Sequence, residues 1–335
     1  QAPELGHNGF SYIWLPPANS ATPGIRALIN DLNRLGIQTI ADLQLTGQTD
    51  TNAVKPNDFT PQWLSSASNL GVQAYQVNQD KAIQPDQIGA LLNGFYEKNQ
   101  IPGLFITTPP EKGNPSKGAS WVNKIIQHMK AEAARIINPR IHDQMLREAL
   151  RKACADPGYD TRNIFANSLR DATSLSGFNV ITFVNSPEYR NQNGIPNDAD
   201  DLIADPLLAY VYTLTNNQLG LPAVFYADYY GGESEADLYL DKEPLKEAID
   251  QLMKTHKQYI FNSHSVEYLN AFDTEKSSVY LSSQNGVDAS NVLIFQMDGS
   301  NTPAGIANKP RGKKDVIVAI NFTREMLKLI RRINM

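Results

Sequence analysis

The chain alternates short apolar runs with longer segments in which apolar residues recur every three or four positions. The run at 10–15 is apolar and is closed by two prolines. In the segment after it, one helical face is formed by Ile25, Leu28, Ile29, Leu32 and Leu35. A second apolar run occupies 37–45. Because such runs predict buried strands and the three-to-four spacing predicts an amphipathic helix, the opening predicts a strand–helix–strand unit with parallel strands.

The same alternation continues through most of the chain. Further helices are expected within 84–99, with Asp86 as N-cap, within 120–138, ended by Pro139, and within 143–156, 205–217 and 242–260. Further strands are expected at 101–108, 177–184 and 221–232. The segment 48–80 shows no clear period, which predicts a loop with at most one short helix.

The last part of the chain changes character. Short β-prone runs at 277–283, 290–299 and 315–323 predict a small sheet, and 324–335 predicts an amphipathic helix or a frayed tail. We therefore expect a β/α domain at 1–270 and a β-rich portion at 271–335. The alternation predicts an α/β fold with a parallel sheet, either a (β/α)-barrel or a doubly wound sheet. In both, ligands bind at the carboxyl ends of the strands.

Composition is that of a globular protein and argues against several classes of function. The chain has 335 residues, 41% hydrophobic and 19% charged, enough for one large domain or two smaller ones. A net charge of −5 argues against nucleic acid as the main partner. Cys154 is the only cysteine, which excludes an intrachain disulfide and a cysteine-based zinc site. We identify no signal peptide and no apolar run of the roughly 18 residues that a membrane span needs.

Several stretches resemble the α-amylase family of glycoside hydrolases in sequence order. The resemblance is carried by "GFSYIWLPPA", "LINDLNRLGIQTIADLQL", "VITFVNSPEYR", "DPLLAYVYTLTNNQLGLPAVFYADYYG" and "KDVIVAINF". It implies a (β/α)8-type barrel, incomplete or remodelled at its N-terminal side, with a shortened excursion near 48–85. It also implies a secreted or periplasmic protein. Family members cleave α-glucans with retention, using an aspartate nucleophile, a glutamate acid/base and a second aspartate.

The catalytic blocks of that family are matched only in part. Phe105 stands where the family has arginine, and Thr107 stands at the nucleophile. Asp143 lies near the expected place of the acid/base, with no evident strand before it. In the fourth block Pro187 replaces histidine and Glu188 replaces aspartate. A hydroxyl cannot replace the carboxylate nucleophile without an activating base, so the resemblance implies impaired catalysis.

Other residues retain the capacity to bind a sugar. Asp42 survives in the first block, although the family's asparagine and histidine are replaced by Thr46 and Gly47. We predict that a ligand would be contacted by Asp42, Tyr189, Arg190, Asp228, Tyr229 and Trp14. Tyr189, Tyr229, Tyr230 and Trp14 could stack on sugar faces. Aromatic rings are equally suited to packing, and Glu188 can instead pair with Arg190.

Three hypotheses follow. The first is an α-amylase-like protein, a pseudoenzyme that binds α-glucan at most. The second is an active α-glucan hydrolase that uses relocated carboxylates, Glu188 with Asp143 or Glu111. The third is a structural or engineered barrel scaffold that binds no sugar. The sequence predicts no nucleic-acid or membrane partner and does not indicate an oligomeric state.

No metal or other cofactor is predicted from a motif. The histidines show no zinc-ligand spacing. Calcium is possible by family resemblance, but the oxygen-bearing residues of the shortened excursion form no calcium-binding pattern. An acidic run formed by Asp198, Asp200, Asp201 and Asp205 is typical of a solvated surface.

Overall fold

The computed structural model describes residues 2–15, 24–43, 71–77, 83–109, 114–189, 202–203, 205–231, 243–261, 263, 265–269, 279–282, 289–298, 316–323 and 328–331. The chain divides into two compact units, Gln1–His142 and Asp143–Met335. The domain boundary predicted between 270 and 271 stays a prediction.

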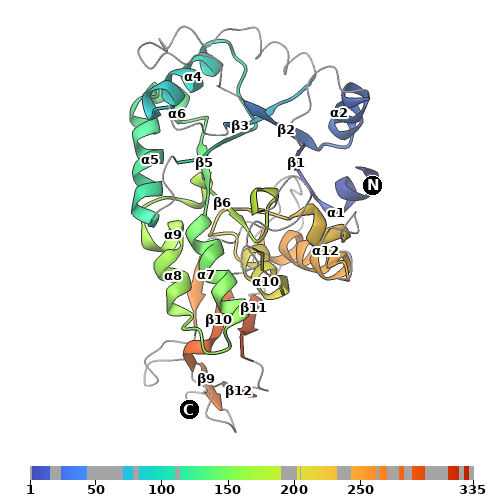
Figure 1. Ribbon diagram of the computed structural model, residues 1–335, viewed down its shortest axis with the longest axis vertical. Coiled ribbons are helices and arrows are strands. Elements are labelled where there is room, and N and C mark those ends of the chain that lie inside the picture. The colour runs from blue at the N-terminus through green and yellow to red at the C-terminus, as the bar shows by residue number, and fades with distance from the viewer. Residues whose placement is uncertain are drawn as a thin grey trace. The chain divides into compact units, whose positions relative to one another are not determined.

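The first unit is built on five parallel strands that follow one another in chain order (Figure 1). They are β1 (Tyr12–Trp14), β2 (Gln38–Leu43), β3 (Ala74–Val77), β4 (Leu104–Thr107) and β5 (Pro139–His142). The register pairs Trp14 with Ile40, Ile40 with Ala74, and Ala74 with Leu104. The carboxyl ends of these strands therefore share one edge of the sheet.

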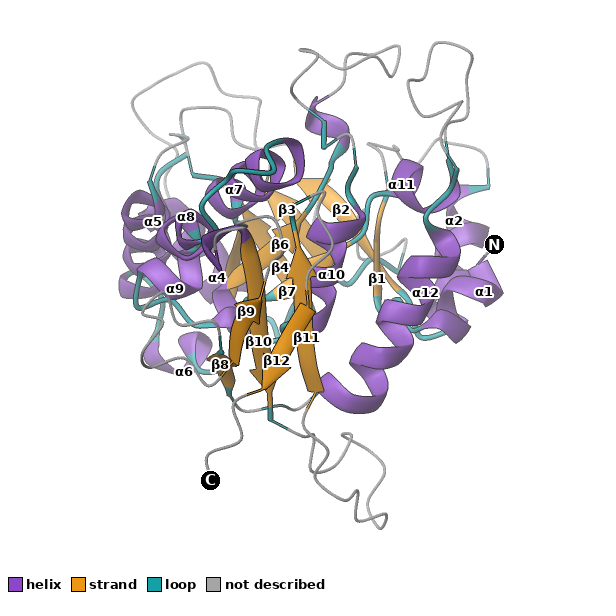
Figure 2. Cartoon of the chain, turned by 90° about the horizontal axis from the view of Figure 1, so that it is seen from below, coloured by secondary structure: helices purple, strands orange, loops and turns teal. Residues whose placement is uncertain are grey.

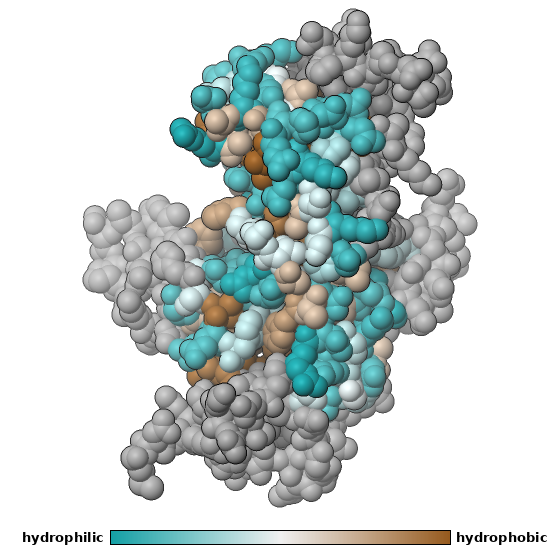
Figure 3. Space-filling view, turned by 90° about the vertical axis from the view of Figure 1, so that its left-hand side faces the viewer, coloured by the Kyte–Doolittle hydropathy of each residue, from teal (hydrophilic) through white to brown (hydrophobic). Residues whose placement is uncertain are grey.

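Helices cover one face of this sheet. They are α1 (Ala2–Asn8), α2 (Ile25–Arg34), α4 (Pro85–Glu97), α5 (Pro115–Gln127) and α6 (Ala131–Ala134). The ring of Phe95 on α4 lies 5.2 Å from that of Tyr75 and 6.4 Å from that of Phe105. Because side chains alternate along a strand, the residues next to Tyr75 and Phe105 face away from the helices. On the face shown in Figure 3, the described surface is largely hydrophilic with small hydrophobic patches.

Two strands of the first unit were not predicted. β3 lies within 48–80, where a loop was expected, and all four of its residues are buried. Its sequence, AYQV, forms no continuous apolar run that would indicate a strand locally. β5 begins at Pro139, which was predicted to end a long helix. Instead, α5 ends at Gln127. Proline is tolerated as the first residue of a strand, although it has no backbone N–H to donate to the neighbouring strand.

One helix start also differs from the prediction. α4 is capped by Gln84 rather than Asp86, and the Gln84 backbone N–H donates to the Gln87 side chain at 2.8 Å. Pro85 then occupies the first helical position, where a missing donor costs nothing.

The second unit contains a further parallel pair, β6 (Val180–Phe183) and β7 (Leu221–Ala223), with Ile181 opposite Leu221. Its helices are α7 (Gln144–Ala155), α8 (Arg162–Asn167), α9 (Leu169–Ala172), α10 (Leu207–Thr215), α11 (Tyr226–Tyr230) and α12 (Lys246–Thr255). Short 3₁₀ turns are η1 (Gly177–Asn179), η2 (Pro187–Tyr189) and η4 (Ala289–Asn291), and η3 (His256–Ile260) is a π-helix that follows α12. The strand predicted at 221–232 is thus a strand followed by a helix.

A small antiparallel sheet belongs to the same unit. Its strand order is β11 (Val316–Asn321), β10 (Val292–Met297) and β8 (Val266–Tyr268) (Figure 2). A separate two-stranded sheet pairs β9 (Val279–Ser282) with β12 (Lys328–Arg331). The prediction of a helix or a frayed tail at 324–335 is therefore wrong for 328–331. Pairing with β9 overrides the local helical pattern there.

The predicted fold class is confirmed: barrel-type β/α repeats are followed by a β-rich C-terminal portion. Within the described ranges, seven strands pair in parallel and no eighth is found. The shortened excursion near 48–85 lies largely outside those ranges.

Candidate functional site

The candidate site of the second unit begins where β6 ends. Val184 and Asn185, which follow β6 directly, are both buried. The Asn185 side-chain amide donates to both carboxylate oxygens of Asp228 at 3.1 Å, and its oxygen accepts from the backbone N–H of Ile203 at 3.0 Å. This network ties the carboxyl end of β6 to α11.

Asp228 is the centre of that network and is only 2% exposed. The Tyr210 hydroxyl on α10 donates to it at 2.6 Å and itself accepts from the backbone N–H of Phe225 at 3.1 Å. A buried carboxylate that accepts several hydrogen bonds is stabilised in place. Asp228, predicted as a ligand contact, therefore also holds the loop after β7. Tyr210 was not singled out from the sequence, because its partner lies 18 residues away.

A buried arginine contacts the segment that begins at Val184. Arg147 on α7 is 2% exposed, and its Nε donates to the Val184 carbonyl at 3.0 Å. Its guanidinium carbon lies 4.1 Å from the ring centroid of Tyr189, a cation–π contact, and the Phe183 ring stacks on Tyr189 at 6.4 Å. Sequence reasoning missed Arg147, although an arginine between buried Leu146 and Ala149 was a usable signal.

Three residues considered from the sequence lie partly or wholly outside the described part of the structure. Glu188 belongs to the turn η2, but its side chain lies outside the described part of the structure. Arg190 and Glu111 lie wholly outside it. The placement of the Glu188 carboxylate relative to other acidic groups is therefore untested.

Asp143 directly follows β5, so the expectation that no strand precedes it is wrong. It caps α7 and is 1% exposed. One carboxylate oxygen accepts from the Leu146 N–H at 3.1 Å, and the other accepts from the Leu169 N–H at 2.8 Å. Burial raises the pKa of Asp143 to about 7, against the effect of these two bonds. Both oxygens are thus engaged by the backbone.

Tyr229 on α11 is buried as well, at 2% exposure. Its hydroxyl donates to Asp250 at 2.5 Å, and the Lys246 ammonium lies 5.4 Å from its ring centroid. The ring of Tyr229 supports the helix and offers no open face to a ligand.

In the first unit, Thr107 ends β4 and is completely buried. Its hydroxyl accepts from the indole N–H of Trp121 on α5 at 3.4 Å, so this side chain faces the helices. Phe105 faces them too, through its contact with Phe95. By alternation, the opposite face of β4 carries Leu104 and Ile106, both apolar. The described part of β4 therefore offers no carboxylate to a ligand.

Asp42 and Trp14 are brought together at the ends of β2 and β1. The Trp14 indole N–H donates to one Asp42 oxygen at 2.9 Å, and both residues are partly buried. Among the described residues, the other Asp42 oxygen has no hydrogen-bond partner. Burial raises the pKa of Asp42, while the bond from Trp14 opposes that rise. The two residues predicted at neighbouring strand ends thus form a contact.

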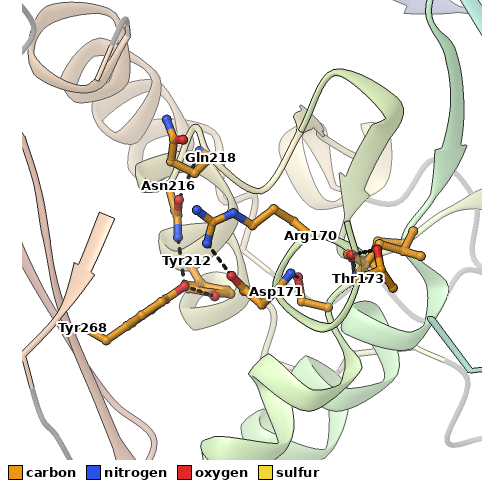
Figure 4. Close-up of polar contacts among 10 residues, drawn as sticks. Arg170, Asp171, Thr173, Tyr212, Asn216, Gln218 and Tyr268 are labelled. Carbon is orange, nitrogen blue, oxygen red and sulfur yellow. Dashed lines mark hydrogen bonds and ion pairs between the residues drawn. The ribbon is translucent and has the colours of Figure 1, made fainter. Parts of the chain in front are cut away.

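A second polar cluster lies among α9, α10 and β8 (Figure 4). The Tyr212 and Tyr268 hydroxyls are 3.0 Å apart, and the Asn216 amide donates to Tyr268 at 3.4 Å. Asp171 forms an ion pair with Arg170. Burial is the main cause that raises the pKa of both tyrosines. No sequence motif marked this cluster, which joins the small sheet to α10.

The described residues supply no metal site and no membrane span. No group of three or more His, Cys, Asp or Glu within them is arranged to hold a metal ion. Apart from Asp205, the acidic run lies outside them, so the structure does not test a fit to calcium. None of the helices in the described part is both long and apolar enough to cross a membrane.

Comparison with known proteins gives a clear result only for structure. A scan against protein-family models finds no match, and neither does a search of curated proteins. Among solved structures, the ligand-free cyclic α-maltosyl-(1→6)-maltose hydrolase of Arthrobacter globiformis matches with a TM-score of 0.56 and 12% identity, over 98% of this chain and 87% of its own. A noncanonic maltogenic α-amylase of Thermotoga neapolitana matches with a TM-score of 0.56 and 10% identity, over 90% of this chain and 77% of its own.

The α-amylase of H. orenii matches with a TM-score of 0.53 and 11% identity, over 89% of this chain and 82% of its own. At such identities the likeness concerns the fold alone. The chain is similar in fold to glycoside hydrolases of the α-amylase type.

Proposed function

We propose that this protein is an α-amylase-like, α-glucan-binding protein whose glycosidic cleavage is impaired. The fold likeness supports the general class, and the Arthrobacter hydrolase has been solved in complex with maltose. A secreted or periplasmic location is part of the proposal, and it rests on the family resemblance. Fold alone does not determine activity, so the proposal depends on the residues at the strand ends.

The observation that carries the impairment is the environment of Thr107. A retaining glycosidase needs a carboxylate that reaches the sugar. Thr107 has no carboxylate, is completely buried and accepts from Trp121 on the helix side. The opposite face of β4 carries Leu104 and Ile106, which cannot act as nucleophiles.

An active hydrolase with relocated carboxylates is the alternative, because Glu188 stands at the carboxyl end of β6. Its best partner from the sequence, Asp143, has both oxygens bound by backbone N–H groups. Retention requires carboxyl groups about 5–5.5 Å apart, and inversion about 6.5–9.5 Å. The engagement of Asp143 makes this alternative less favoured.

The test pairs a reducing-sugar assay on starch with calorimetric titration of maltoheptaose, using one preparation of the full chain. We expect binding without appreciable hydrolysis, and we expect Glu188→Gln to leave the residual rate unchanged. Turnover in the ordinary enzymatic range, roughly 1–1,000 per second, that is abolished by Glu188→Gln would establish the hydrolase instead. No heat of binding with any α-glucan would favour the scaffold hypothesis.

A further inference from the structure

Two tyrosines on α11 form an aromatic pair at the surface. Tyr226 is 44% exposed and Tyr230 is half-buried. They stand four residues apart on one helical turn, which brings their side chains together. Their ring centroids are 4.9 Å apart, and the ring planes are tilted by 44°. Of this pair, Tyr230 was named from the sequence, together with Tyr229, as a residue that could stack on a sugar, whereas Tyr226 was not singled out.

The pair is supported from inside the protein. The Tyr230 ring meets the buried Tyr229 ring edge-on, with centroids 4.7 Å apart at 85°. Tyr229 is in turn fixed by its hydrogen bond to Asp250, which forms an ion pair with Lys246 at 3.0 Å. Binding to aromatic rings that are already ordered costs less conformational entropy.

Hydrogen bonds of Asp228 also hold α11 in place. The carboxylate of Asp228, within this helix, binds Asn185 and Tyr210, and its carbonyl accepts from the Leu245 N–H at 2.9 Å. The helix follows β7 after two residues, Val224 and Phe225. The tyrosine pair thus stands at the carboxyl end of a parallel strand, where such folds bind ligands.

We propose that Tyr226 and Tyr230 form a platform that binds an α-linked gluco-oligosaccharide; this rests on the proposed function. The apolar C–H face of a pyranose ring packs on an aromatic ring, and a tyrosine hydroxyl can hydrogen-bond a neighbouring sugar hydroxyl. Because the two rings are tilted, they suit successive units of a curved α-1,4-linked chain better than a flat β-1,4-linked one. Tyr229 supports this platform without contacting the sugar.

The experiment is calorimetric titration of maltoheptaose into the full chain and its variants. Tyr226→Ala and Tyr230→Ala should each weaken binding about 3- to 10-fold. Tyr226→Phe, which keeps the ring, should stay within about 3-fold of the unchanged protein. Tyr259→Ala is the matched control, because Tyr259 is 36% exposed and lies on η3. It should bind as the unchanged protein does, and cellohexaose should bind more weakly than maltoheptaose.

The outcomes separate the two proposals. If the unchanged protein binds maltoheptaose but both alanine variants bind equally well, the platform is wrong and the proposed function stands. Equal loss in Tyr259→Ala would also overturn the platform, as would equal affinity for cellohexaose. If the unchanged protein binds no α-glucan, the proposed function fails and the platform with it. Thermal melting of each variant checks that a loss of binding is not a loss of fold.

Discussion

At the scale of single residues, two buried carboxylates of the second unit accept hydrogen bonds that hold its elements together. Asp228 and Asp143 are both almost fully buried, and each accepts two or more hydrogen bonds. Removing a partner from a buried polar group leaves the other group unsatisfied, which costs more than the bond itself contributes. These carboxylates therefore influence stability whatever they do for a ligand.

Asp228→Asn should destabilise the fold by about 1–3 kcal/mol. The new amide group would meet the Asn185 amide or the Tyr210 hydroxyl, which both donate in the native protein. Urea denaturation measures the change. Asp31→Asn is the control, because Asp31 on α2 is 61% exposed and its substitution should shift stability by less than about 0.5 kcal/mol. An unchanged midpoint for Asp228→Asn would contradict the role of this network.

Asp143 predicts a pH dependence of stability. Burial raises its pKa from the ordinary value of 3.8 to about 7, so the folded state binds the proton more tightly than the unfolded state. The free energy of unfolding should therefore fall as pH rises from 3.8 to about 7 and level off above that. The loss from this group is about 4 kcal/mol at most.

The measurement is denaturant unfolding at several pH values, compared with Asp143→Asn. The asparagine cannot ionise, so the variant should show a flatter profile across this window, whatever its absolute stability. Parallel profiles for the two proteins would rule out Asp143 as the titrating group.

At the scale of elements, the connection into β7 depends on a glycine. Gly220 has a φ of +149°, and a Cβ built there would lie 2.6 Å from the Val180 carbonyl oxygen. A side chain at this position must therefore displace the backbone of β6. The close approach of these two segments explains why glycine precedes β7.

Gly220→Ala should destabilise the protein by about 2 kcal/mol or more, since both strain and a clash oppose the new methyl group. Gly94→Ala is a suitable comparison, because nothing lies within 4 Å of a Cβ built at that position in α4. It should stabilise the helix by up to about 1 kcal/mol. Thermal melting of both variants tests the contrast, and a stable Gly220→Ala protein would show that the connection is more adaptable than the structure indicates.

The elements also show what local pattern can and cannot predict. The amphipathic helix α2 and the buried strand β6 were predicted correctly, because each has a regular pattern within its own sequence. The strands β3, β5 and β12 were missed because their sequences (AYQV, PRIH and KLIR) mix polar and apolar residues, unlike the VITF of β6, and depend on pairing with a distant partner.

The hydrogen-bond partners within the candidate site could not be predicted from local sequence. Asp228 was predicted to contact a ligand, yet nothing local indicated that it binds Asn185, 43 residues away. The direction in which the Thr107 side chain points could not be predicted from the sequence either. It follows from the packing of α5 against β4, which the sequence of β4 alone does not contain.

At the scale of the whole molecule, the net charge of −5 is unfavourable for binding phosphate backbones. A labelled DNA duplex should therefore show no change in fluorescence anisotropy on titration with the protein at about 150 mM salt. A basic protein of similar size serves as the positive control. Salt-dependent binding would reveal a local basic surface that net charge does not report.

The orientation of Thr107 has a consequence for the design of a carboxylate nucleophile on β4. The substitution Thr107→Asp would place a charge beside the Trp121 indole, between β4 and α5, where both side chains are buried. Such a protein should unfold more readily and gain no turnover. A designed nucleophile would have to stand on the opposite face of the strand, at Ile106, and would require changes in the residues around it.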